Sequence, residues 1–260
     1  MMPAGYAALE GQLALWLIAA IRPGAAFFAA PLFGGDAVPV QVRFIIALGI
    51  GLPATGALHA AMPPQGMLSL PGVALVAGEV LAGLALGLAV RIGYSAALVA
   101  GEVIGNAMGL GFAAMVDPAS GQQSNAVSTW LSILATFLFL AGDGHLALAA
   151  TVAESHAAMP PGQGGPAADA MESLARFGGV LFSAGLAIAL PVGFAVLLVQ
   201  IIMASLARSA PQLNLFAVGL PAALIGGILL LAIATPTMAD AIILAIGLGL
   251  EQAAALATGG

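Results

Sequence analysis

The chain has no cysteine and no lysine, and charged residues occupy only 6% of its 260 positions. Without cysteine there is neither a disulfide framework nor thiol chemistry. A soluble domain carries about 25% charged residues, so this chain has too few to cover a surface that faces water. Its net charge of −6, with no basic patch, argues against a nucleic-acid partner.

Hydrophobic residues make up 62% of the chain, and they lie in long runs. A helix that crosses the hydrocarbon core of a membrane needs about 20 such residues. The composition therefore predicts an all-α integral membrane protein with about six to eight helices. The start of the sequence has neither the basic stretch nor the cleavage site of a removable signal peptide. The apolar segments are residues 12–33, 44–62, 70–116, 126–153, 173–207 and 216–257.

Prolines lie inside these apolar segments, and each removes a backbone donor and favours a kink. The pair Thr235-Pro236 is predicted to divide the last segment in two. In lipid, backbone groups freed in this way need partners from protein or from a water-lined cavity. We therefore expect broken helices packed into hairpins rather than a set of simple rods. The prolines concerned are Pro23, Pro53, Pro191, Pro221 and Pro236.

Residues 154–172 are polar and rich in proline and glycine, as a flexible linker is. They are predicted to join two parts, residues 1–153 and 173–260, within one membrane domain that spans residues 1–260. No sequence repeat relates the two parts. The five arginines are scattered, so no loop has the excess of basic residues that sets membrane orientation.

Small residues recur at every fourth position of one apolar segment, where they form a single stripe on a helix. Such a stripe lets another helix backbone approach closely. The simpler alternative is chance, because glycine and alanine are abundant in this chain. We favour close helix packing for the stripe, which comprises Gly93, Ala97, Gly101, Gly105, Gly109 and Ala113.

Three charged residues, Glu79, Arg91 and Glu102, lie within the apolar segment 70–116. Ionisable groups at membrane depth are costly and indicate a functional or structural role. Arg91 and Glu102 are about 16 Å apart along a continuous helix and do not form a direct pair. Two interpretations of Arg91 remain open: a helix end at the interface, with the segment split, or a buried ion pair with another helix. A proton relay is less favoured.

The sequence gives little support for enzymatic activity or for metal binding. Asp143-Gly144-His145 is interpreted as a relaxed helix end, since a metal would need further ligands, and His59 and His156 are predicted to lie in unrelated loops. Ser183 follows Phe182 in a Gly/Ala-rich run, but no motif supplies an oxyanion hole for a serine protease. We predict no catalytic, metal-binding or cofactor-binding residues.

Several stretches resemble the FliR family of type III export gates, whose injectisome counterpart is the SctT family. The most specific are MGLGFAAMVDP, within the run that begins at Gly101, and PQLNLFAVGLP, within residues 207–224. Residues 22–44 and 79–105 are also similar to the family, in the same order along the chain. The tail MVDPASGQQ favours the flagellar branch.

This resemblance implies a noncatalytic subunit without a cofactor. In the family, such a chain is similar to a FliP-like unit fused to a FliQ-like unit. It forms with FliP and FliQ the pore through which unfolded flagellar proteins leave the cell. FlhB-like and FlhA-like proteins are further expected partners, together with membrane lipid. The expected location is the bacterial inner membrane, at the flagellar basal body.

The resemblance also implies that the loop after the small-residue stripe plugs the closed pore. Its apolar residues would form a deformable obstruction, its glycines would act as hinges, and Asp-Pro would start a turn. The alternative is a wet turn between helices with no gating role. The plug residues are Gly109, Leu110, Gly111, Phe112, Ala113, Ala114, Met115, Val116, Asp117 and Pro118.

Two departures from the family pattern concern charge. Asp36 stands where the family often has a basic residue, and the C-terminal part is nearly free of charge. Arg208, beside the PQLN motif, is expected to contact a neighbouring subunit or to cap a helix C-terminus.

A different class of protein remains as the alternative, a stand-alone transporter of small solutes. Broken helices with isolated charges near the midplane are typical of such proteins. A transporter would lose uptake on substitution of Glu79 or Glu102.

Overall fold

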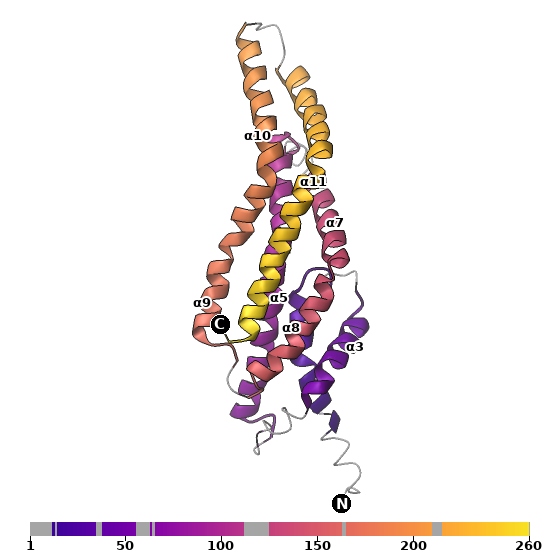
Figure 1. The fold of residues 1–260 in the computed structure, drawn as a ribbon, viewed down its shortest axis with the longest axis vertical. Helices are drawn as coiled ribbons and strands as arrows, with labels where there is room; N and C mark the ends of the chain where they lie inside the picture. The colour runs from indigo at the N-terminus through magenta and orange to yellow at the C-terminus, as the bar shows by residue number, and fades with distance from the viewer. Residues whose placement is uncertain are drawn as a thin grey trace, which may run out of the picture. The chain divides into compact units, whose positions relative to one another are not determined.

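The computed structural model describes residues 12–13, 15–34, 38–55, 63, 66–111, 125–162, 165–209 and 215–259. All regular structure within these ranges is helical, which confirms the predicted all-α class (Figure 1). The first elements are α2 (Ile21–Ala29), α3 (Val40–Gly51), the short 3-10 helix η1 (Leu52–Ala54) and α5 (Leu70–Ala107). They are followed by α7 (Ala126–Ala141), α8 (Gly144–Ala158), α9 (Ala168–Phe177), α10 (Gly179–Ser209) and α11 (Leu215–Ala257).

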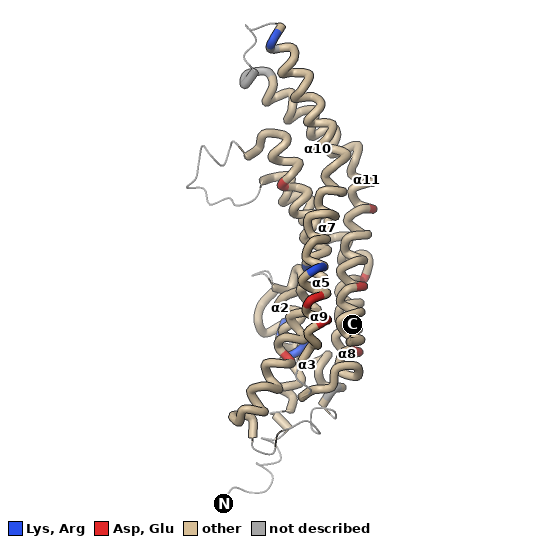
Figure 2. Tube along the Cα trace, turned by 90° about the vertical axis from the view of Figure 1, so that its left-hand side faces the viewer, with Lys and Arg blue, Asp and Glu red and all other residues tan. Residues whose placement is uncertain are grey.

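Among the described residues, three stretches are long and apolar enough to cross a membrane: Leu70–Ala107, Ala168–Leu206 and Gly219–Ala257. The pair α7 and α8 makes a fourth candidate, bent by 61° at the break between its helices. Charged residues are sparse along α10 and α11 (Figure 2). Most of the apolar residues of the described chain thus lie in a few very long helices.

The prediction that Thr235-Pro236 divides the last segment is wrong. Helix α11 runs for 43 residues with Pro221 and Pro236 inside it. Each proline removes one backbone donor, and the apolar residues on both sides keep theirs, so the helix continues. Helix α5 is likewise continuous through Arg91, which rules out a helix end at that residue.

A sharp bend separates α7 from α8, so the helix end predicted at Asp143-Gly144-His145 is present. Asp143 takes a left-handed conformation, with φ of 53°, that glycine adopts freely and that asparagine and aspartate adopt more often than other residues. The prediction assigned this relaxation to Gly144, which instead begins α8. His156 was expected in a loop, but it lies in the last turn of α8.

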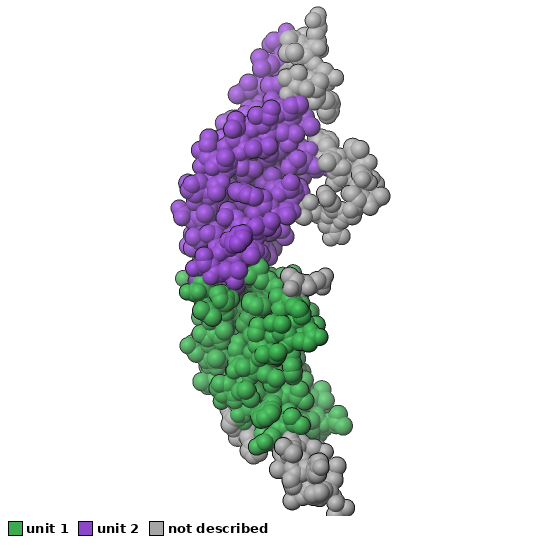
Figure 3. Space-filling view, turned by 90° about the vertical axis from the view of Figure 1, so that its right-hand side faces the viewer, with its two compact units in different colours: residues 1–92, 143–178, 247–260 green, residues 93–142, 179–246 purple. Residues whose placement is uncertain are grey.

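The described chain forms two compact units, drawn in different colours in Figure 3. Unit 1 comprises residues 1–92, 143–178 and 247–260, and unit 2 comprises residues 93–142 and 179–246. Both therefore draw on sequence before and after the predicted linker. Within unit 1, α2 packs on α3 and α8. Ile18, Ala19 and Leu75 form a small apolar core there.

Helix α7 packs on α5 within unit 2. The Tyr94 hydroxyl on α5 lies 3.0 Å from the Ser132 carbonyl and 2.8 Å from the Thr136 hydroxyl on α7. The Tyr94 ring meets Phe139 edge-on, with ring centres 6.4 Å apart. This contact fixes the two helices against each other on the side that carries the small-residue stripe.

Candidate functional site

The predicted plug begins where α5 ends. After Ala107 the chain makes a turn, in which Gly109 has a φ of +84° that suits glycine alone among common residues. The Gly109 N–H donates to the Asn106 carbonyl at 3.0 Å, and the Leu110 N–H donates to the Gly105 carbonyl at 2.9 Å. The start of the segment is therefore fixed to the last turn of α5. The plug residues Phe112 to Pro118 lie outside the described residues.

The chain is described again at Asn125, which caps the N-terminus of α7. Its side-chain oxygen accepts from the Ser128 N–H at 2.9 Å. Its amide nitrogen donates to the Glu102 carboxylate on α5 at 2.9 Å, and its backbone N–H reaches the other Glu102 oxygen at 3.4 Å. Both ends of the segment between Gly111 and Asn125 are thus attached to the C-terminal part of α5.

The small-residue stripe permits this attachment. A Cβ at Gly101 would overlap the Ser128 backbone, and a Cβ at Gly105 would overlap the Asn125 side chain. Ala97 and Gly93 continue the stripe as buried residues. Because the stripe has no bulky side chains, α7 lies close enough to α5 for the Glu102 carboxylate to accept a hydrogen bond from Asn125.

Two further helices of unit 2 meet the end of α5. The Gln200 amide on α10 donates to the Ala107 carbonyl, one of the terminal carbonyls that a helix leaves without an internal partner. The Met108 side chain is buried, and it fills the space where Gly227 on α11 lacks a Cβ. Helices α7, α10 and α11 thus all contact the end of α5, from which the segment starts.

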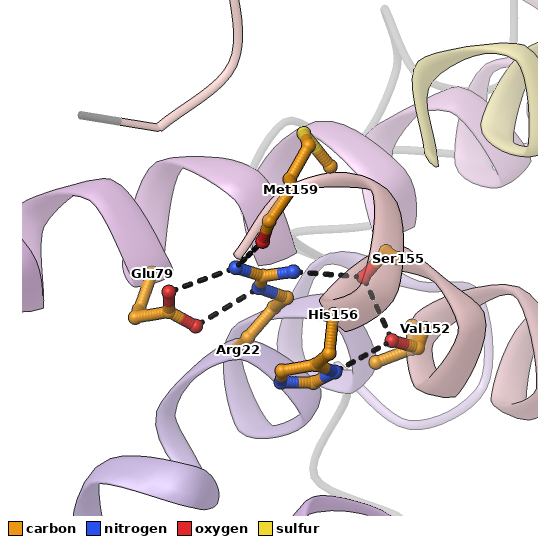
Figure 4. A network of polar contacts seen from close by, with 6 residues as sticks. All are labelled: Arg22, Glu79, Val152, Ser155, His156 and Met159. Atoms are coloured by element: carbon orange, nitrogen blue, oxygen red, sulfur yellow. Dashed lines mark hydrogen bonds and ion pairs between the residues drawn. The ribbon is translucent and has the colours of Figure 1, made fainter. Parts of the chain in front are cut away.

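A second polar centre lies inside unit 1 (Figure 4). The Arg22 guanidinium on α2 donates two hydrogen bonds to the Glu79 carboxylate on α5, of 2.9 and 2.8 Å. It also donates to the Ser155 hydroxyl at 3.1 Å and to the Met159 carbonyl at 2.8 Å. Both charged residues are only 2% exposed. One arginine thereby joins α2, α5 and α8, and the sequence did not predict this role for it.

His156 lies beside this network and is also buried. Its Nδ1 lies 3.0 Å from the Val152 carbonyl, which leaves Nε2 without a hydrogen-bond partner among the described residues. Since a carbonyl only accepts, this contact requires a proton on Nδ1, and in the neutral imidazole Nε2 is then an acceptor.

Three further charged residues in the apolar helices are exposed: Arg91, Arg208 and Asp240. Arg91 and Arg208 have no hydrogen bond or ion pair to the described residues. Arg208 lies in the last turn of α10, where the helix dipole favours a positive charge. Asp240, for which the sequence predicted no role, is exposed in the middle of α11 and likewise lacks a partner in the described chain.

The residues considered for catalysis and metal binding are not brought together. Within the described ranges, no three histidine, cysteine or acidic residues lie close enough to hold a metal ion. The Ser183 hydroxyl is exposed, and among the described residues it bonds only the backbone carbonyl of Val180 in its own helix.

Long apolar helices with a few buried or isolated charges define this chain as an all-α membrane protein. Residues 13–247 match the model of the family described as bacterial export proteins, family 1, and the chain belongs to that family.

Relatives from several bacteria agree with this family. The flagellar biosynthetic protein FliR of Pectobacterium carotovorum is 36% identical over 207 residues, covering 80% of this chain and 78% of its own length. That of Escherichia coli K12 is 33% identical over 212 residues, covering 81% and 80%. That of Bacillus subtilis 168 is 30% identical over 210 residues, covering 79% and 80%. The chain is thus a membrane component of the bacterial flagellar export apparatus.

Proposed function

We propose that this chain is a noncatalytic subunit of the flagellar export gate in the inner membrane, at the basal body. It assembles with FliP-like and FliQ-like subunits into the pore for unfolded flagellar proteins. FlhB-like and FlhA-like proteins are its further partners. Residues 1–153 correspond to the FliP-like part and residues 173–260 to the FliQ-like part.

The segment from Gly109 to Pro118 closes this pore as a plug. The observation that supports this proposal is that the chain on both sides of the undescribed residues 112–124 is attached to α5, at Gly109 before them and at Asn125 after them. A plug needs a root that holds while a polypeptide passes, and here the root is made by the Gly109 turn and the bond of Glu102 to Asn125. The apolar sequence of the segment supplies an obstruction that can deform around a substrate.

The alternative of a solute transporter is less well supported. Both carboxylates that it would use already have protein partners, Glu79 with Arg22 and Glu102 with Asn125. The cavity beside Arg22 and Glu79 measures about 180 Å³. Sites for small ligands usually measure about 300–1,000 Å³, so this cavity is small for a substrate.

Deletion of residues 112–116 tests the plug. The complex with the partner subunits should still form, and cells that contain it should lose membrane potential, measured with a voltage-sensitive dye. The matched control deletes Gln163 and Gly164 from the connection between α8 and α9, which should leave the membrane sealed. If both deletions leave the potential unchanged while the complex is present, the segment is not the plug.

A further inference from the structure

Asp240 is a carboxylate in the middle of a very apolar helix. It lies near the centre of the candidate span Gly219–Ala257, and its side chain is exposed. No hydrogen bond or ion pair connects it to another described residue. A charged group at such a depth is expensive unless another group pairs with it.

The helix face around Asp240 is apolar. Residues three, four and seven positions away share its face. Among them Ile233, Ile243 and Leu244 are exposed by 77%, 51% and 67%. Thr237 is the one hydroxyl on this face, and it bonds the Ala234 carbonyl of its own helix. A wall facing a water-filled lumen would carry more polar groups than this.

A second acceptor lies on the same helix. Because Pro236 has no N–H, the carbonyl of the exposed residue Ala232 loses its helical partner. Lipid tails offer no donor to either acceptor. Asp240 also differs from Arg91, whose long side chain can reach toward the membrane surface, whereas a short aspartate cannot.

We propose that Asp240 anchors a contact with a neighbouring subunit, whose apolar helix presents an arginine or lysine to this carboxylate. Charge complementarity supports this assignment, because the face around Asp240 is otherwise largely apolar and offers this carboxylate no cation. This contact rests on the proposed assembly with other gate subunits, and it does not depend on the proposed plug.

The test compares Asp240→Leu with Glu251→Leu, which removes an exposed carboxylate near the end of the same helix. Each variant is purified in mild detergent from flagellated bacteria, and native mass spectrometry measures the amount of bound subunits. We expect Asp240→Leu to lose bound subunit at least about tenfold, because it leaves a buried cation without its partner. Glu251→Leu should stay within about twofold of wild type, because this exposed carboxylate lies near the helix end and beyond the apolar residues that surround Asp240.

Charge exchange then identifies the partner residue. In the Asp240→Arg background, each arginine or lysine in the apolar helices of the co-purified subunit is changed to aspartate. One exchange should restore the complex. The thermal unfolding of Asp240→Leu purified alone should match wild type, since Asp240 has no partner within its own described chain.

The outcomes separate this inference from the proposed function. If the bound subunits are FliP-like and FliQ-like but Asp240→Leu retains them as Glu251→Leu does, the contact is refuted while the proposed function stands. If other subunits are bound and Asp240→Leu releases them, the contact stands and the proposed partners are wrong. A wild-type chain that purifies alone refutes both.

Discussion

The substitution Arg22→Met removes the cation that joins three helices of unit 1. The Glu79 charge then stays buried without a partner, and the Ser155 and Met159 oxygens lose a donor. Breaking a buried ion pair in this way costs about 3–5 kcal/mol. At roughly 2–4 °C per kcal/mol for a chain of this size, the midpoint of thermal unfolding should fall by about 6–20 °C.

The double substitution Arg22→Met with Glu79→Met should be less harmful than Arg22→Met alone. It removes both charges, and apolar side chains of similar volume can replace a buried ion pair at little cost. The Ser155 hydroxyl still has a partner, because it donates to the Val152 carbonyl at 2.7 Å. Only the Met159 carbonyl loses a bond that nothing replaces.

The assay is thermal unfolding of the purified chain in detergent, followed by tryptophan fluorescence. The ion pair of Arg176 with Glu172 is the matched control, because its side chains are 79% and 61% exposed. Exposed pairs contribute about 0–1 kcal/mol, so Arg176→Met should shift the midpoint by less than about 4 °C. If Arg22→Met shifts it no more than Arg176→Met, or if the double variant is as unstable as the sum of its single changes, the network does not hold unit 1 together.

Two further predictions use the same measurement. Gly101→Ala places a methyl group onto the Ser128 backbone and should cost about 1–3 kcal/mol, whereas Gly193→Ala, which meets nothing within 4 Å in α10, should gain about 0.5–1 kcal/mol. Equal effects of these two changes would contradict close packing of α7 on the stripe. Asp143→Gly should stabilise the chain by about 1 kcal/mol, because glycine adopts the left-handed conformation there without strain; a loss of stability would mean that the Asp143 carboxylate does more than occupy the bend.

The sequence was sufficient for the class of fold and for the long apolar segments, because composition alone decides both. It also located a helix end within Asp143-Gly144-His145, where polar residues interrupt an apolar run, but it assigned the relaxed conformation to Gly144 and not to Asp143. The predicted helix break at Pro236 was wrong, because the loss of one backbone donor costs little compared with the many hydrogen bonds that a 43-residue helix retains. Local patterns overstate the effect of a single proline.

The polar contacts were harder to predict. Glu79 was recognised as a buried charge, but its partner Arg22 lies 57 positions away, and no local pattern links them. Glu102 and Asn125 are separated by the predicted plug itself. A role for Asp240 was not predicted, because a single carboxylate in an apolar run matches no motif. Only the fold shows that its side chain is exposed and has no partner among the described residues. The proposed plug role of Gly109–Pro118 came from the resemblance and not from the residues alone.

The length of α11 has a consequence for the membrane around it. Its candidate span of 39 residues extends for about 58 Å, while the hydrocarbon core of a bilayer is about 30 Å thick. To fit inside that core, the helix would have to tilt by about 60°, far beyond the 0–40° that single helices adopt. Local thickening of the bilayer by a few ångströms cannot make up the difference. Much of this hydrocarbon surface must therefore lie beyond the reach of lipid, where only other protein can shield it from water.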